Sequence, residues 1–115
     1  MRISDIQMIE GITPPHHYDM KSFKLLDAKR KKEGFLGVSL SLYLPGAYTD
    51  FGEQPLETAY YILAGELLLE TEKTQYKVQT GQIVHIRAGE YKRLRNVKKE
   101  TAEVLVIVNT SEAEQ

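Results

Sequence analysis

Lys92 is the residue whose type and position point most directly to chemistry. In an extended segment side chains alternate between two faces, so Lys92, Leu94 and Asn96 share one face while Arg93 and Arg95 share the other. Because burying an unpaired arginine is unfavourable, we expect the arginine face to meet water and Lys92 to point inward. An ammonium group placed there must be paired, partly deprotonated or set against an anionic ligand.

Three interpretations of Lys92 remain open, in order of preference. In the first, Lys92 forms an ion pair with Glu57 or Glu53 and fills the interior. In the second, it binds a carboxylate, phosphate or enolate oxygen of a small molecule, and in the third its aliphatic stem carries the charge to solvent. The sequence leaves open which glutamate faces inward, since a β-bulge near Gly52 or Pro55 would reverse the alternation.

The histidines are the next candidates. His16, His17 and His85 are the three histidines of the chain, and one of the first two could join His85 at a metal ion if the N-terminal segment folded over the rest. Adjacent residues of an extended chain point in opposite directions, so only one of His16 and His17 would contribute. We favour ordinary hydrogen-bonded or surface histidines, and keep His85 as a candidate pocket residue.

Tyrosines gather in the middle of the chain, where Tyr43, Tyr48, Tyr60 and Tyr61 lie close in sequence. Of the adjacent pair, alternation turns one inward and one outward. Aromatic walls with a hydroxyl group suit a small aromatic or carbonyl ligand, although ordinary packing in a core or an interface accounts for tyrosines equally well.

These side chains must be positioned by β-strands, because period-2 alternation recurs along the chain and helical periodicity does not. Glycine-containing turn signals such as Pro45-Gly46 and Ala88-Gly89 separate the apolar segments. Many short strands at nearly regular spacing predict an all-β sandwich or barrel. The predicted strands are 22–27, 36–44, 59–64, 66–72, 75–79, 82–87, 91–97 and 102–109.

Composition narrows the function classes. The 115 residues suffice for one domain, and 15 basic against 16 acidic residues argue against a nucleic-acid partner. The chain has no cysteine, which excludes disulfides, thiolate metal sites and a cysteine nucleophile. Its apolar runs are too short to span a membrane, its first 20 residues lack a signal-peptide pattern, and we expect it in the cytoplasm. The basic run 29–32 is expected to be a solvated hairpin tip.

Two segments resemble the motifs of the cupin superfamily. The segment GQIVHIRAGEYKRLRN, residues 81–96, is similar to the second motif, G-x5-P-x-G-x2-H-x3-N, with both glycines and the asparagine in register. The segment GAYTDFGEQPLETAYYILAG, residues 46–65, is similar to the first motif, G-x5-H-x-H-x3,4-E-x6-G. The resemblance covers about residues 35–109 and implies a double-stranded β-helix, or jelly-roll barrel.

The resemblance also locates the family's metal ligands, three histidines and a glutamate. Gly52, Gln54, Thr58 and Lys92 stand at these four positions, so we expect no metal in the usual cupin place and no cofactor. The same register turns Tyr60 inward together with Thr58. The candidate ligand-binding residues are therefore Lys92, Tyr60, His85, Glu57, Gln54 and Tyr43.

The sequence thus predicts an extended arm at 1–20 that contacts a partner in a homodimer, a cupin barrel at 21–110 and a frayed tail at 111–115. The expected function is metal-independent binding of a small anionic or aromatic metabolite in the barrel. One alternative is a metal-free isomerase, lyase or decarboxylase of a small acid that uses Lys92 with Glu57 or His85. A metal-dependent dioxygenase with a displaced site ranks below both, and the sequence leaves open whether the protein is an enzyme.

Overall fold

The computed structural model describes residues 1–27 and 31–111, and within them almost all regular structure is β-strand. Every strand pairing is antiparallel, which confirms the all-β prediction. Two short 3-10 turns, η1 (Ile6–Met8) and η2 (Lys31–Glu33), are the helical elements of this part of the chain, and neither approaches the length needed to cross a membrane. The strands are β1 (His17–Asp27), β2 (Leu36–Thr49), β3 (Gly52–Glu53), β4 (Thr58–Ala64), β5 (Glu66–Glu70), β6 (Gln75–Gln79), β7 (Ile83–Ile86), β8 (Tyr91–Arg95) and β9 (Ala102–Asn109).

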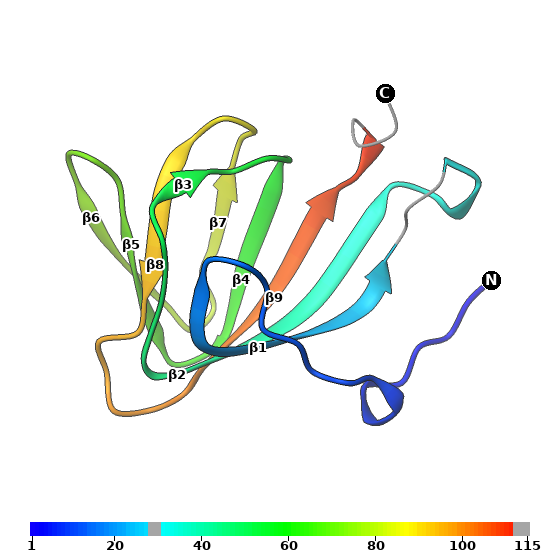
Figure 1. The fold of residues 1–115 in the computed structure, drawn as a ribbon, viewed down its shortest axis with the longest axis horizontal. Coiled ribbons are helices and arrows are strands. Elements are labelled where there is room, and N and C mark those ends of the chain that lie inside the picture. Colours follow the sequence, from blue (N-terminus) through cyan, green and yellow to red (C-terminus); the bar gives the residue numbers. More distant parts are fainter. Residues whose placement is uncertain (28–30, 112–115) are drawn as a thin grey trace.

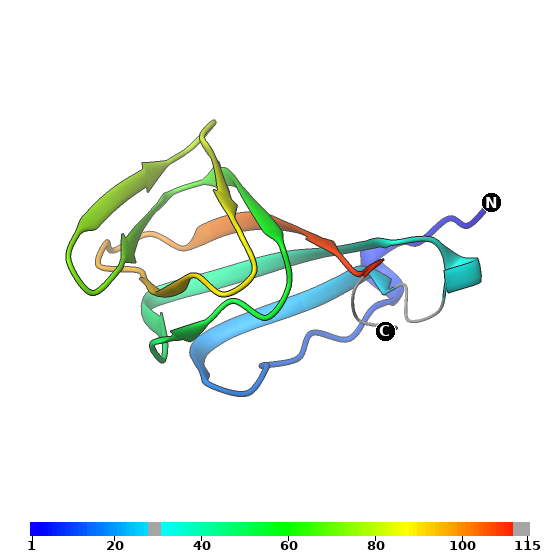
Figure 2. The same ribbon diagram turned by 90° about the horizontal axis from the view of Figure 1, so that it is seen from above.

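The strands form one strongly curved sheet in the order β6-β5-β8-β2-β9-β4-β7, with β1 on β2 and β3 on β8. Figure 2 shows the sheet curling into a barrel, with β1, β2 and β9 extending beyond it on one side. The long strand β2 is the centre of this arrangement, because it pairs with β1, β8 and β9. The predicted jelly-roll barrel is the observed fold.

Strand β2 has polar side chains on its inner face and leucines on its outer face. Ser41 and Tyr43 are buried on the inner face, whereas Leu36 and Leu44 are exposed on the outer face. The leucine-rich side of the strand therefore covers the outside of the barrel, and the serine-rich side lines the interior. A sheet that encloses only a hydrophobic core would be expected to face the other way.

The apolar core and the buried Asn96 close one part of the barrel. Asn96 donates from Nδ2 to the carbonyl oxygens of Tyr43 and Glu100, and its Oδ1 accepts from the backbone N–H of Lys98. The amide thus ties β2 to the β8–β9 loop at a site where an unpaired polar group would be costly. The core residues are Met20, Tyr43, Ala47, Tyr60, Ile62, Leu67, Leu69, Val78, Ile86, Leu94, Ala102 and Val104.

The N-terminal segment differs from the prediction. The first strand begins at His17, five residues before its predicted start, so the end of the predicted arm belongs to the barrel. The preceding residues fold back along the same strand, where Ile12 and Ser22 exchange two backbone hydrogen bonds of 2.9 and 2.7 Å (Figure 1). Of the predicted frayed tail only Ser111 lies within the described residues, and residues 29 and 30 of the predicted hairpin tip lie outside them.

Gly65 lies in the turn between β4 and β5, and its substitution tests how closely this turn packs against β9. Its φ is +82°, and a Cβ there would lie 2.9 Å from Ala102 Cα, whereas Gly81, with φ +88°, has open space around it. Gly81→Ala is expected to lose about 1–2 kcal/mol from the left-handed backbone alone. Gly65→Ala should lose a further 1–3 kcal/mol, roughly, from overpacking. Urea unfolding of both variants measures the difference, and equal losses would contradict the close approach of the β4–β5 turn to β9.

Candidate functional site

A cavity of about 590 Å³ opens among β1, β2, the β3–β4 loop and β8. Its volume falls in the range of small-molecule sites. Apolar surface comes from Met20, Val106, Phe51, Pro55 and the Pro14-Pro15 segment, among others, while 13 of the 20 lining residues have polar side chains. The polar side chains of the lining include His16, His17, Ser22, Lys24, Ser39, Ser41, Tyr43, Thr49, Asp50, Glu53, Gln54, Tyr60 and Lys92.

Lys92 enters this cavity from β8 without a charged partner. It lies opposite Gly52 of β3, and its Nζ is 5.5 Å from the centroid of the Tyr60 ring, a cation–π contact. Within residues 1–27 and 31–111 its side chain forms no ion pair and no hydrogen bond, so the predicted pair with Glu53 or Glu57 is not formed. Burial lowers the pKa of Lys92 to about 8.

Gly52 leaves the space beside Lys92 open, since a Cβ at this position would meet nothing within 4 Å. Next to it, Gln54 and two residues of β4 form a short network. The Gln54 Nε2 donates to Thr58 Oγ1 at 2.8 Å, and the Tyr60 hydroxyl donates to Gln54 Oε1 at 3.2 Å. Burial raises the pKa of Tyr60 to about 12, so its hydroxyl is a neutral donor. Tyr60 is buried and Tyr61 exposed, which confirms the predicted alternation.

The sequence predicts that the two arginines of β8 face water, but in the structure both pair with a carboxylate. Arg93 and Arg95 both contact Glu70 Oε1, and Glu70 is almost fully buried beneath them. Burial opposes ionisation of Glu70, but the hydrogen bonds from Arg95 and Arg93 outweigh it and lower its pKa. Glu70 of β5 therefore neutralises the arginines on the outer face of β8, whereas Lys92 on the inner face has no carboxylate partner among the described residues.

His17 is one of the two arm histidines whose place the sequence left open, and the structure puts it in the cavity wall. Its Nδ1 lies 2.8 Å from the carbonyl oxygen of Pro15, which can only accept, so Nδ1 carries the proton and Nε2 keeps its lone pair. Burial lowers the pKa of His17, the bond to Pro15 opposes this effect, and the charge of Lys92 lowers the pKa further. The sequence could not supply this placement, because it depends on the backbone at His16, whose φ of +64° turns the chain into β1.

His16 occupies the rim of the same cavity. Its Nδ1 lies 3.1 Å from Asp50 Oδ2, which also accepts from the Tyr18 hydroxyl at 3.0 Å. Tyr18 stacks on Tyr48, so this cluster ties the start of β1 to the end of β2. Both adjacent histidines thus line the cavity, although only His17 is half-buried there.

Glu57 and His85 lie on the outside of the barrel, which corrects their expected place in the pocket. His85 Nε2 and Glu57 Oε2 are 2.7 Å apart, and Asn109 Nδ2 donates to Glu57 Oε1 at 3.1 Å. The cause is strand alternation: Thr58 and Ile86 face inward as a β4–β7 pair, so the residue preceding each faces outward. His85 therefore does not meet the arm histidines, and Lys92 contacts neither Glu57 nor His85.

The four positions that carry metal ligands in the resemblance do come together, but their side chains do not fit a metal. Gly52 has no donor atom, the Gln54 amide oxygen already accepts from Tyr60, and the Lys92 ammonium repels a cation. In the described part of the chain no cluster of three His, Cys, Asp or Glu side chains is arranged to hold an ion.

Comparison with known proteins identifies the family. A model described as a cupin domain matches residues 40–108. The chain belongs to the cupin family. A Mycobacterium tuberculosis protein named beta-D-galactosidase Rv1717 is 25% identical over 108 residues, which cover 94% of this chain and 93% of that protein.

Solved cupin-like structures show the same fold at low sequence identity. The polyketide cyclase RemF from Streptomyces resistomycificus superposes with a TM-score of 0.80 and 18% identity, over 96% of this chain and 80% of RemF. A predicted oxalate decarboxylase from Thermotoga maritima gives 0.79 and 17%, over 95% of this chain and 99% of that protein. These similarities establish the barrel and leave its ligand to be argued from the cavity.

Replacement of Lys92 tests whether its charge is truly uncompensated. The folded state holds its proton less tightly than the unfolded chain, so the unfavourable burial of the charge is present below pH 8 and disappears as the pH rises toward 10.5. Lys92→Met should therefore raise the unfolding free energy at pH 7 by about 1–3 kcal/mol, and the gain should shrink between pH 8 and 10.5.

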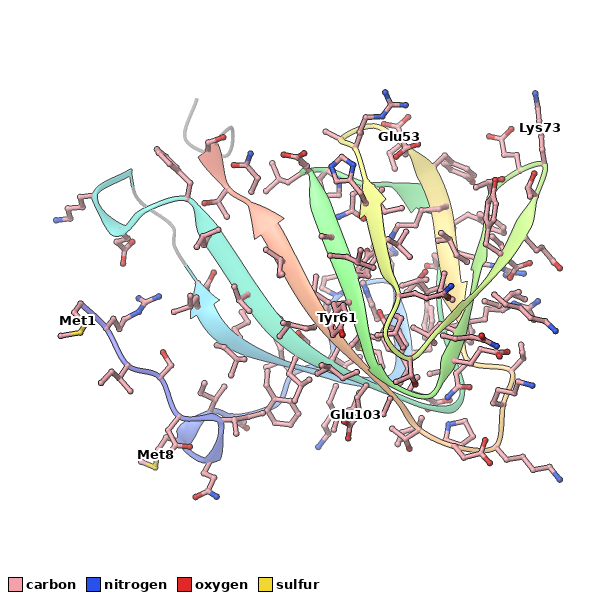
Figure 3. All side chains as sticks on the ribbon, turned by 180° about the vertical axis from the view of Figure 1, so that it is seen from behind. Met1, Met8, Glu53, Tyr61, Lys73 and Glu103 are labelled. Atoms are coloured by element: carbon pink, nitrogen blue, oxygen red, sulfur yellow. The ribbon has the colours of Figure 1, made fainter. Side chains whose placement is uncertain are left out.

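The control is Lys73→Met, at the tip of the β5–β6 turn, where the side chain points away from the barrel (Figure 3). This variant should keep the stability of the unaltered protein within about 0.5 kcal/mol at both pH values. Chemical denaturation at pH 7 and pH 10 measures both variants. A loss of stability in Lys92→Met would mean that a carboxylate pairs with Lys92 in solution.

Proposed function

We propose that this cupin binds a small anionic metabolite in the barrel cavity, with Lys92 as the charge partner and without a metal ion at the usual cupin position. The observation that carries the proposal is an ammonium group in the barrel cavity that forms no ion pair with any carboxylate of the described residues, although Asp50 and Glu53 line the same cavity. Such a group is stabilised when a ligand supplies the missing negative charge. A carboxylate, phosphate or enolate oxygen would serve.

Free hydroxyl groups around Lys92 support the proposal. Ser22, Ser41 and Tyr43 are buried in the cavity wall, and their hydroxyls have no hydrogen-bond partner among the described residues. Among the described residues, no buried polar side-chain atom sealed from solvent lacks a partner, so these hydroxyls open into the cavity. They offer donors to a polar ligand, and the rings of Tyr43 and Tyr60 offer a wall for an aromatic one.

Benzoate and benzamide form a matched pair of probes, because they share shape and differ in charge. The unaltered protein should bind benzoate at least about tenfold more tightly than benzamide, since a charge-assisted hydrogen bond contributes roughly 1.5–3 kcal/mol. Lys92→Met should abolish this preference, and Lys73→Met should keep it. Isothermal titration calorimetry measures the six affinities, two for each of the three proteins. Equal binding of the two probes to the unaltered protein would refute an anion site at Lys92.

Metal-free catalysis on the bound acid is a second candidate, favoured by His17. Its Nε2 keeps a lone pair in the cavity that Lys92 enters, which provides a base where Glu57 and His85 do not reach. The names of the relatives, a beta-D-galactosidase, a polyketide cyclase and a predicted oxalate decarboxylase, all denote enzymes. Glycoside cleavage ordinarily uses two carboxylates, and Asp50 and Glu53 are those of this cavity, so a chromogenic β-galactoside belongs among the first substrates assayed.

We also propose that the protein is a cytoplasmic homodimer. A cysteine-free chain gains nothing from an oxidising compartment. On the outer face of the sheet, cross-strand pairing aligns Leu40, Leu105, Tyr61 and Ile83 in one apolar row. Figure 3 shows Tyr61 near the middle of this face. Tyr61 and Ile83 of this row are exposed and Leu40 and Leu105 are half-buried, and such a row suits an interface with a second copy, alongside the arm contact expected from the sequence.

Ile83→Lys tests the dimer. Ile83 is 62% exposed at the end of the row, whereas Val97 is 55% exposed in the loop after β8 and away from it. Light scattering after size exclusion should give twice the chain mass for the unaltered protein. Ile83→Lys should weaken dimerisation at least about tenfold, and Val97→Lys should leave it unchanged. A monomer at all concentrations would contradict the proposal.

A further inference from the structure

We infer that Lys92 forms a reversible imine with the carbonyl carbon of a small 2-oxo acid held in the barrel cavity. This inference rests on the proposed function, because the acid must first bind beside Lys92. It adds a covalent step and a substrate class that neither the family match nor the named relatives assign to this chain. The first support is the absence of any competing bond to Nζ among the described residues.

The surroundings of Nζ leave room for a carbonyl compound. Gly52 stands opposite Lys92 in the β3–β8 pair, and no atom lies within 4 Å of where its Cβ would be. The Tyr60 ring flanks Nζ at 5.5 Å, and the π-face of this ring would stabilise the positive charge of a protonated imine. The Tyr60 ring thus holds the amine at the cavity wall, and the open space at Gly52 lets a carbonyl compound reach it.

The amine is also available in its nucleophilic form. With a pKa of about 8, roughly one Lys92 side chain in five is unprotonated at pH 7.4, against about one in a thousand for a lysine of ordinary pKa. An ion pair with a carboxylate would remove this advantage by raising the pKa again. Because no protein carboxylate pairs with Lys92 in the described structure, an anionic ligand has room to bind. For the same reason the amine stays reactive.

The step conserves atoms and electrons. The Nζ lone pair forms a C–N bond to the carbonyl carbon, and the C=O π-electrons move to oxygen, which takes a proton to give a carbinolamine. Loss of that hydroxyl as water then leaves C=N, so one amine and one ketone give one imine and one water with no redox change. His17, with its proton on Nδ1 held by Pro15 and Nε2 free, is the neutral base in the cavity that can accept and return the proton.

A 2-oxo acid fits better than a simple aldehyde. Once Lys92 has reacted, the ligand carboxylate faces an iminium cation that it partly neutralises. The free hydroxyls of Ser22, Ser41 and Tyr43 supply donors for the carboxylate oxygens. The hydroxyl groups of the cavity wall would thus hydrogen-bond the carboxylate, while Lys92 reacts with the carbonyl carbon.

Borohydride reduction after incubation with pyruvate tests the inference. Intact-mass spectrometry of the unaltered protein should show a gain of one pyruvic acid less one oxygen, and peptide mapping should place it on Lys92. Modification of Lys92 should exceed that of the exposed Lys73 by at least about tenfold, because the larger unprotonated fraction outweighs the lower intrinsic nucleophilicity. Lys92→Arg, which keeps the charge but cannot form the imine, should show no adduct at this position.

Lactate separates this inference from the proposed function, because it carries the carboxylate without the carbonyl. Thermal melting first establishes that Lys92→Arg and Lys92→Met are folded. If lactate and pyruvate both bind through Lys92 but reduction traps nothing, the imine is refuted and the anion site stands. If neither acid binds, both proposals fail. Equal labelling of Lys73 and Lys92 would also refute the inference, because it would show ordinary surface chemistry.

Discussion

The pairing of β2 with β9 is the constraint on which the rest of the structure depends. Eight successive residue pairs, from Leu36–Asn109 to Tyr43–Ala102, fix one register for both strands. A slip by one residue would exchange the two faces and turn the leucines of β2 into the cavity. In the observed register, serine and tyrosine hydroxyls line the interior while the apolar row lies outside. The hydroxyl groups in the cavity wall and the apolar row on the outer surface therefore have a common cause.

Strand β8 carries three cationic side chains, of which two form ion pairs within the described protein and one does not. Arg93 and Arg95 share the buried carboxylate of Glu70, and Arg93 also stacks on Phe51, so both are satisfied within the protein. Lys92, on the opposite face of the same strand, contacts the Tyr60 ring and forms no ion pair or hydrogen bond within the part of the chain that the structure describes. A chain selected for stability alone would gain from an apolar residue at this position. The charge of Lys92 is thus the physical basis of the proposed anion site.

Much of the fold could be predicted from the sequence, because glycine turns and period-2 alternation are local signals. The same alternation correctly turned Tyr60 inward, and it also contained the information that Glu57 and His85 face outward, since each precedes a residue that is turned inward. The sequence left open whether His16 or His17 closes over the barrel mouth, because the answer depends on the turn at His16 and on Pro15 as a hydrogen-bond acceptor. Likewise, nothing in the sequence linked Glu70 to Arg93 and Arg95, which the sheet brings together from separate strands.

The aromatic composition of the cavity wall has a practical consequence for optical work. The chain has seven tyrosines and no tryptophan, so its ultraviolet absorption and intrinsic emission come from phenol rings. Two of these rings, Tyr43 and Tyr60, line the cavity, and Tyr60 lies next to Lys92. Occupation of the cavity changes the polarity around both chromophores without any label. The protein thus carries its own reporter, and one tryptophan introduced elsewhere would supply an independent reference signal.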